Sequence, residues 1–213
     1  PDDLDGVPVQ VLAIPWITRS GIVASLSMDS SSEENPQELI ENSLSAWLNQ
    51  TIADLDPSMP AILTAHASIA GAKFGSEQSV KIGRDVVLPP GLVANPVLDY
   101  VALGHIHRFQ DLNEGSHPPV VYPGSIERVD FGEINEEKGF VLAEIEKGQT
   151  RYRWQKLPIR QFRDFSVTLD EMLGVNEKIF AALPPSEDLA EAIVRLTLIY
   201  PRDLETLIDE ARI

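Results

Sequence analysis

The motif Gly104-His105-Ile106-His107, which closes the apolar run at residues 99–104, constrains this chain more than any other feature. Such a run predicts a buried strand, and in an extended strand residues i and i+2 point to the same side, so both imidazoles can face one pocket. His66 ends a second apolar run, at residues 61–65. Because the carboxyl ends of parallel strands meet at one edge, where ligand sites form, we expect these three histidines to converge on a metal ion.

A single histidine at the edge of a core is more often held by hydrogen bonds than by a metal, so His66 alone predicts little. The pair of His105 and His107 carries the inference, since Gly104 leaves room for a group close to the backbone. His117, the fourth histidine, lies in a turn-forming stretch, and we interpret it as a solvated loop residue. The chain has no cysteine, so a metal must be held by imidazole, oxygen ligands or water, which suits manganese, iron or zinc. A mononuclear zinc site made of the first three histidines alone is also open.

The apolar runs predict a mixed α/β (α+β) fold. Asn35-Pro36-Gln37-Glu38 has the N-cap, the early proline and the acid of a helix start, and apolar residues follow at helical spacing to about Leu55. This helix lies between apolar strands at 7–15 and 61–66, an order for which parallel pairing is expected. Further runs predict short strands and a β-hairpin, at 86–88, 100–105, 120–122 and the pair 139–146 with 150–155. We therefore expect two sheets flanked by helices, with a loop over the site at residues 71–83.

The character of the sequence changes near Leu157-Pro158, where we place a domain boundary. Residues 1–158 form the first domain, and residues 159–213 begin a second, small α+β unit. The elements predicted for this unit are a strand at 165–169, a helix at 170–183, a strand at 192–200 and a helix from Pro201 to Ile213.

Hydropathy and charge limit the environment of the protein. No apolar run is long enough to cross a bilayer and no signal-peptide pattern is present, so we expect a soluble, cytoplasmic protein without membrane partners. The formal net charge of −16 repels nucleic acid on average. Residues 61–132, which include the three candidate histidines, are the least acidic region, with seven acids and five bases. A bound metal pair makes such a pocket locally positive, so an anionic substrate is compatible with the composition.

The spacing of His66, the Gly104–His107 motif and Tyr122-Pro123-Gly124-Ser125 resembles the carboxyl-terminal half of the calcineurin-like metallophosphoesterases. Residues 122–133, together with Glu137-Lys138-Gly139-Phe140, are similar to one branch, the DNA double-strand-break-repair exonuclease subunits of the SbcD type. The resemblance covers residues 7–160. It implies a two-sheet metallophosphoesterase sandwich, partial in this chain, followed by a capping unit that helps to select DNA substrates.

For the site, the resemblance implies that His66 and His105 bind one metal ion and His107 binds a second. Two divalent ions about 4 Å apart hold the scissile phosphate and activate a water for in-line attack. Mn²⁺ is the expected metal, with Mg²⁺, Fe²⁺ or Zn²⁺ as alternatives. The implied enzyme is a metal-dependent DNA exonuclease and endonuclease subunit in DNA repair and recombination, which works as a homodimer with an SbcC-type ATPase.

Three further residues are candidates for substrate binding. Gly124 and Ser125 bring backbone near the phosphate or form a structural turn. Arg128 binds a DNA phosphate or pairs with Glu127 and Asp130.

The amino-terminal motifs of the family, Asp-x-His, Gly-Asp and Gly-Asn-His-Asp, do not occur in this chain. In the family they supply the bridging aspartate, the asparagine and the histidine that protonates the leaving group, so we expect the catalytic residues upstream of Pro1. We expect this chain to be a fragment that by itself holds metal weakly and is inactive as a nuclease. Two alternatives are a small-molecule phosphodiesterase or phosphatase of the same superfamily, and a non-catalytic module that docks an ATPase or DNA.

Overall fold

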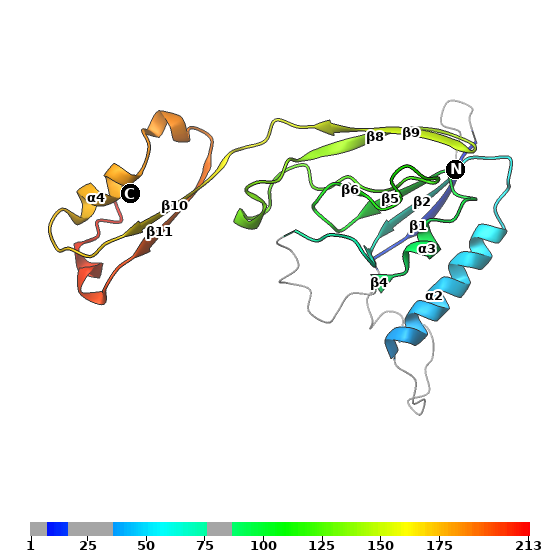
Figure 1. Cartoon of the computed structure of the whole chain (residues 1–213), viewed down its shortest axis with the longest axis horizontal. Helices are drawn as coiled ribbons and strands as arrows, with labels where there is room; N and C mark the ends of the chain where they lie inside the picture. Colours follow the sequence, from blue (N-terminus) through cyan, green and yellow to red (C-terminus); the bar gives the residue numbers. More distant parts are fainter. Residues whose placement is uncertain (1–7, 17–35, 76–86) are drawn as a thin grey trace. The chain divides into compact units, whose positions relative to one another are not determined.

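The computed structural model describes residues 8–16, 36–75 and 87–213 (Figure 1). The chain forms two compact units. The first unit comprises Pro1–Ile126 and Glu136–Leu157, and the second comprises Glu127–Asn135 and Pro158–Ile213. Residues 127–135 thus belong to the second unit although they precede the predicted boundary. Within the described ranges, no helix combines the length and apolar character needed to cross a membrane.

A five-stranded sheet is the centre of the first unit. Its order is β1-β2-β5-β7-β6, in which the first four strands are parallel and β6 is antiparallel to β7. The strands are β1 (Gln10–Ile14), β2 (Ala61–His66), β5 (Tyr100–Gly104), β6 (Gln110–Asp111) and β7 (Val120–Tyr122). Leu63, Val101 and Val120 are fully buried, because a parallel sheet covered on both faces takes continuous apolar runs. The predicted α/β class and parallel pairing are confirmed.

Helix α2 (Pro36–Ala53) packs against this sheet through an apolar stripe. Leu48 and Ile52, four positions apart, are buried in the same core as the β2 side chains. The helix begins at the predicted proline, whereas the predicted N-cap Asn35 and the part of the predicted 71–83 loop after Gly75 lie outside the described residues. The smaller elements of this unit are β3 (Ser68–Ile69), its partner β4 (Val87–Leu88) and α3 (Pro90–Val93).

The predicted β-hairpin is present as β8 (Gly139–Glu146) and β9 (Gln149–Lys156), which pair antiparallel. In Figure 1 the hairpin runs along one side of the five-stranded sheet, and α2 and α3 lie on the other. Aromatic pairs connect the hairpin to the sheet region. The ring centroids of Tyr152 and Tyr100 are 6.5 Å apart, and those of Trp154 and Phe109 are 5.2 Å apart in a stacked arrangement.

The buried carboxylate of Asp99 joins the hairpin to the amino ends of β2 and β5. Its Oδ2 accepts hydrogen bonds from Ala61 N at 2.7 Å and from Lys147 Nζ at 3.1 Å. Its Oδ1 accepts one from Gly148 N at 2.6 Å. A carboxylate that is 1% exposed needs such donors, because each buried charge without partners costs free energy. Asp99 therefore holds three segments of the first unit together.

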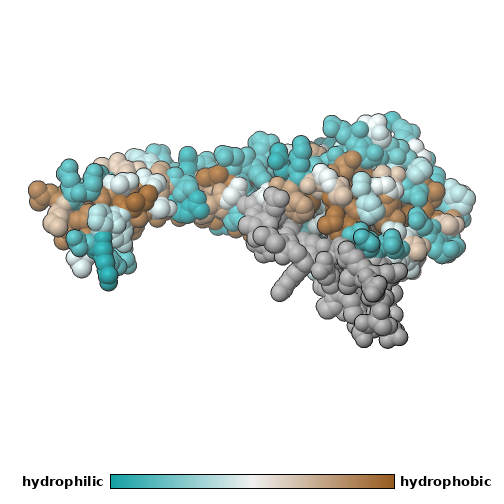
Figure 2. All heavy atoms as spheres, turned by 60° about the horizontal axis from the view of Figure 1, so that its bottom comes forward, coloured by the Kyte–Doolittle hydropathy of each residue, from teal (hydrophilic) through white to brown (hydrophobic). Residues whose placement is uncertain are grey.

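The second unit is built on two parallel strands, β10 (Phe162–Thr168) and β11 (Ile193–Ile199). Its other elements are η2 (Phe131–Glu133), α4 (Val175–Ala182), η3 (Ser186–Leu189) and η4 (Arg202–Leu207). Across the strands, Arg195 Nε donates to Asp164 Oδ1 at 2.9 Å, and this hydrogen bond lowers the pKa of Asp164. Met172 and Leu173 are 66% and 90% exposed, and Figure 2 shows apolar side chains, in brown, at the surface of this unit.

Two helix predictions for the second unit need correction. The helix predicted at 170–183 begins only at Val175, after Gly174 in a left-handed conformation with φ of 69°. The helix predicted from Pro201 to Ile213 is a 3₁₀ helix that ends at Leu207. Asn176 explains this end, because its Nδ2 donates to Leu207 O at 3.0 Å and its Oδ1 accepts from Asp209 N at 2.9 Å. A continuing α-helix would need these same backbone groups for its own hydrogen bonds.

We expect Asp99→Asn to lower the free energy of unfolding of the first unit by about 3 kcal/mol, because the amide turns one acceptor into a donor beside three buried donors. Urea unfolding followed by tryptophan fluorescence measures this, since Trp16, Trp47 and Trp154 all lie in the first unit. The control Glu144→Gln, at an exposed position of β8, should change the free energy by less than about 0.5 kcal/mol. Equal stability of the two variants would contradict the role of Asp99.

Candidate metal centre

His66 and His105 lie side by side at the carboxyl edge of the five-stranded sheet. Parallel pairing sets Ile14 opposite Ala65 and His66 opposite Gly104, so β1, β2 and β5 end at the same edge. The ring centroids of His66 and His105 are 5.1 Å apart. Two of the three histidines named from the sequence therefore converge, as strand ends in a parallel sheet lead us to expect. Their role as metal ligands stays a prediction.

The backbone around this pair allows close approach and is strained at one point. A Cβ on Gly104 would lie 2.9 Å from His66 Nδ1, so glycine is what leaves the His66 ring in place. His105 has a φ of 97°, a left-handed value that costs a non-glycine residue on the order of 1–3 kcal/mol. Strain of this kind persists where the surrounding structure enforces it, and it clusters at functional sites.

The expectation that His105 and His107 project from one strand is wrong, because β5 ends at Gly104. The left-handed φ of His105 turns the chain out of the strand direction, so the alternation of side chains no longer applies. His107 is held through its backbone. Its carbonyl oxygen accepts hydrogen bonds from Ser125 N at 3.1 Å and from Lys138 Nζ at 3.0 Å.

Trp16 is a member of this cluster that the sequence pattern does not single out. It follows β1 by two residues, and its ring centroid lies 5.0 Å from that of His66 and 4.5 Å from that of His105. The residue is 44% exposed, so it covers part of the histidine pair while one side stays in water. Its place after the carboxyl end of a parallel strand is the available signal, the same one that selects His66.

The turn at Tyr122-Pro123-Gly124-Ser125 braces the histidine-bearing segments. Tyr122 is fully buried, its hydroxyl donates to Ala67 O at 2.6 Å, and burial raises the pKa of this phenol. Gly124 has a φ of 81°, and a Cβ there would lie 2.8 Å from His107 O and 3.0 Å from Phe109 N. Gly124 and Ser125 thus contact the backbone of His107, and their proposed contact with a phosphate stays a prediction.

The contacts of Arg128 and His117 involve neither His66 nor His105 among the hydrogen bonds and ion pairs described for them. Arg128, in the second unit, donates from Nε to Glu133 O at 3.1 Å and from Nη1 to Arg160 O at 2.8 Å. This guanidinium therefore ties two segments of its own unit, and a role in DNA binding stays a prediction. His117 is exposed, as interpreted from the sequence, and its Nε2 lies 4.0 Å from Asp99 Oδ1 at the opposite end of β5.

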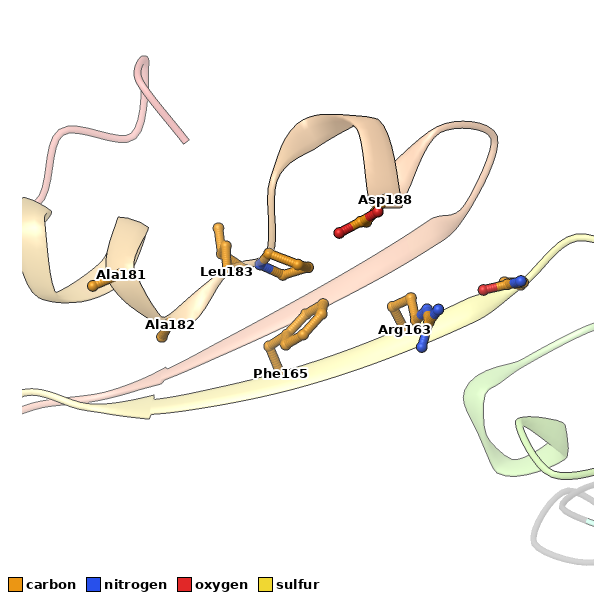
Figure 3. Close-up of a pocket in the computed structure, with 8 residues that line it drawn as sticks. Arg163, Phe165, Ala181, Ala182, Leu183 and Asp188 are labelled. Carbon is orange, nitrogen blue, oxygen red and sulfur yellow. The ribbon is translucent and has the colours of Figure 1, made fainter.

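The second unit contains an open hollow of about 740 Å³ between β10 and the end of α4. Figure 3 shows Arg163 and Phe165 on β10 facing the segment that carries Leu183 and Asp188. Its lining contains one arginine and one aspartate among apolar and amide side chains. This set has neither a histidine nor a pair of carboxylates, so it is not a second candidate metal centre.

The donors at the sheet edge fit part of a metal centre. Two neutral imidazoles whose ring centroids are 5.1 Å apart can bind the same divalent ion. Among the residues that the structure describes, no group of three or more His, Asp or Glu side chains is arranged to hold a metal ion. The described part of the chain thus brings together two candidate ligands, His66 and His105, and no complete ligand set.

Gly124→Ala tests the contact between the turn at residues 122–125 and the backbone of His107. We expect it to lower the free energy of unfolding of the first unit by about 1 kcal/mol for the positive φ and by a further 1–3 kcal/mol for the contact with His107 O. Gly115→Ala is the matched control, because Gly115 has a φ of 75° in the same unit and no atom within 4 Å of an added Cβ. Urea unfolding of both variants gives the difference. Equal losses in the two variants would mean that the cost at Gly124 comes only from its positive φ and not from a contact with His107 O.

Comparison with known proteins identifies relatives of the chain, although no family model matches it. It is 31% identical over 147 residues to the SbcD subunit of the nuclease SbcCD from Rhodobacter capsulatus, a match that covers 67% of this chain and 35% of that protein. It is 26% identical over 215 residues to the SbcD subunit of the same nuclease from Staphylococcus epidermidis, covering 96% of this chain and 54% of that protein. It is also 29% identical over 118 residues to the uncharacterized metallophosphoesterase YhaO of Bacillus subtilis, covering 55% of this chain and 26% of that protein.

The chain thus spans about a third of the first relative and about half of the second. The three relatives agree with the resemblance read from the Gly-His-x-His and Tyr-Pro-Gly-Ser motifs. With identities of 26% to 31%, this chain is a distant homologue of the SbcD nuclease subunits and their metallophosphoesterase relatives.

Proposed function

We propose that this chain is part of an SbcD-type subunit of a cytoplasmic DNA nuclease, which hydrolyses phosphodiester bonds with the help of divalent metal ions during DNA repair and recombination. The observation that carries the proposal is the approach of His66 and His105, whose ring centroids are 5.1 Å apart. The left-handed backbone of His105 supports it, since strain of this kind is costly and clusters at functional sites. The relatives named as SbcD subunits of the nuclease SbcCD add support from sequence.

In this proposal His66 and His105 bind one ion and His107 binds the other, with Mn²⁺ as the first choice and Mg²⁺, Fe²⁺ or Zn²⁺ as alternatives. When bound, such ions polarise a phosphoryl oxygen and lower the pKa of a bound water. The residues of this chain contribute neutral imidazole donors in fixed positions, and Trp16 limits the access of water to one side of the pair. The net charge of −16 makes local positive charge at such a site important for an anionic substrate.

The proposal extends to architecture and partners. The five-stranded sheet and the β8–β9 hairpin would be parts of a two-sheet metallophosphoesterase sandwich, and residues 159–213 the start of a capping domain that selects DNA substrates. The partners would be DNA, a second copy of the subunit and an SbcC-type ATPase, in keeping with the name SbcCD carried by the relatives.

Titration of this chain with Mn²⁺ by calorimetry tests the ligand set. We expect weak binding, because losing even one group that supports a ligand costs about 10–100-fold in affinity, and here the acidic motifs of the family are absent from the sequence. His105→Ala should remove the remaining heat of binding. The control His117→Ala should retain it, since His117 lies at the opposite end of β5. A tight isotherm with two sites would contradict this expectation.

Cleavage assays on the complete gene product that contains this chain test the activity. With Mn²⁺ we expect hydrolysis of linear duplex DNA, and we expect His105→Ala to reduce the rate by at least about a hundredfold. Hydrolysis of a small aryl phosphodiester without cleavage of DNA would instead assign a small-molecule phosphodiesterase. Binding of DNA or of the ATPase without hydrolysis of either substrate would assign a docking module.

A further inference from the structure

Lys138 is a buried lysine next to the candidate metal centre. It directly precedes β8, and its side chain is 0% exposed. Its Nζ donates to Glu136 Oε2 at 2.8 Å and to His107 O at 3.0 Å. A buried ammonium is costly unless it is paired and hydrogen-bonded, and these contacts give it a carboxylate and a carbonyl oxygen.

The carbonyl of His107 is the point on which several segments converge. Ser125 N and Lys138 Nζ both donate to this oxygen, and an sp² carbonyl has two lone pairs to offer. The preceding Ile106 is 2% exposed and packs in the main core of the first unit. The strained His105 is therefore followed by one residue fixed by its side chain and another fixed by its carbonyl oxygen.

Strand β8 reaches both ends of β5 through two lysines. At the amino end of β5, Lys147 donates to Val97 O at 2.9 Å and to Asp99 Oδ2 at 3.1 Å. Beyond its carboxyl end, Lys138 makes the same pair of contacts, one to a backbone carbonyl and one to a carboxylate. The two lysines differ in burial, since the side chain of Lys147 is 31% exposed and that of Lys138 is 0% exposed.

We propose that Lys138 is a positioning residue of the candidate metal centre. Its ammonium holds the carbonyl of His107 and so keeps residues 104–107 in the strained conformation that sets the ring of His105 beside that of His66. Only the part of this inference that concerns metal binding rests on the proposed function. The placement of the rings can be tested without any metal.

Lys138→Met and Lys147→Met form a matched pair of variants. Each removes an ammonium that bridges a backbone carbonyl and a carboxylate, and each keeps a side chain of similar length. Both should lower the urea midpoint of the first unit, so stability alone does not distinguish a positioning role from a structural one. The distinguishing readout is the position of the histidine rings.

NMR of the imidazole groups in metal-free protein provides this readout, because the chain has only four histidines. We expect Lys138→Met to shift or broaden the signals of His66, His105 and His107 and to leave that of His117 unchanged. We expect Lys147→Met to do the reverse, since His117 Nε2 lies 4.0 Å from the carboxylate that Lys147 binds. Unchanged signals of His66 and His105 in Lys138→Met would overturn the proposal.

Addition of Mn²⁺ to the same samples separates the two proposals. In the unsubstituted chain, paramagnetic broadening of the His66 and His105 signals supports the proposed function, and its absence at all Mn²⁺ concentrations counts against that function alone. Where broadening occurs, Lys138→Met should require about tenfold more Mn²⁺ and Lys147→Met the same amount as the unsubstituted chain. An equal requirement in both variants would overturn the positioning role.

Glu136→Gln provides a second route if Lys138→Met does not fold. It removes the charge that pairs with the Lys138 ammonium and so weakens, without deleting, the hydrogen bond of that ammonium to His107 O. We expect smaller shifts of the His66 and His105 signals in the same direction. Unchanged signals in this variant would likewise overturn the proposal.

Discussion

The pairing of His66 with Gly104 in the parallel sheet decides where the candidate functional side chains lie. In this register the glycine at the end of one strand faces the imidazole at the end of its neighbour, and any side chain at residue 104 would displace that ring. A slip of one residue would also turn the apolar side chains of β2 to the opposite face. Because Leu63 and Val101 are fully buried, the core and the histidine pair depend on the same register.

The strain at His105 requires support from outside the sheet, and the β8–β9 hairpin supplies it. At one end of β8, Lys138 binds the carbonyl of His107. At the other end, Lys147 and the adjacent turn bind the carboxylate of Asp99, just before β5. The loop after β5 thus cannot relax without breaking contacts of a buried charge. Breaking them costs more free energy than the strain of one left-handed residue, which is on the order of 1–3 kcal/mol.

Features that depend on local periodicity follow from the sequence, while those that depend on a distant partner do not. Strands β2 and β5 and the hairpin are of the first kind. The approach of His66 to His105 is predictable for a different reason, since the carboxyl ends of parallel strands meet at one edge of a sheet. In the sequence Glu136-Glu137-Lys138, Lys138 resembles a surface charge. Its burial depends on a contact with a carbonyl 31 residues away, which no local pattern indicates. In the same way, Asn176 ends η4 by binding Leu207, again 31 positions away. The φ of His105 could not be predicted for another reason, since left-handed values are rare for residues other than glycine.

The turn at residues 122–125, through which the chain resembles the nuclease branch, contributes none of the three candidate metal ligands, yet it contacts both segments that carry the histidines. Tyr122 donates to Ala67 O, next to His66, and Ser125 N donates to His107 O. A displacement of this turn would therefore move both segments together. Its presence alongside the Gly-His-x-His motif then has a physical reason, because it sets the spacing of the two loops. Gly124 is where that spacing is tightest, since even a Cβ there would meet the His107 carbonyl at 2.8 Å.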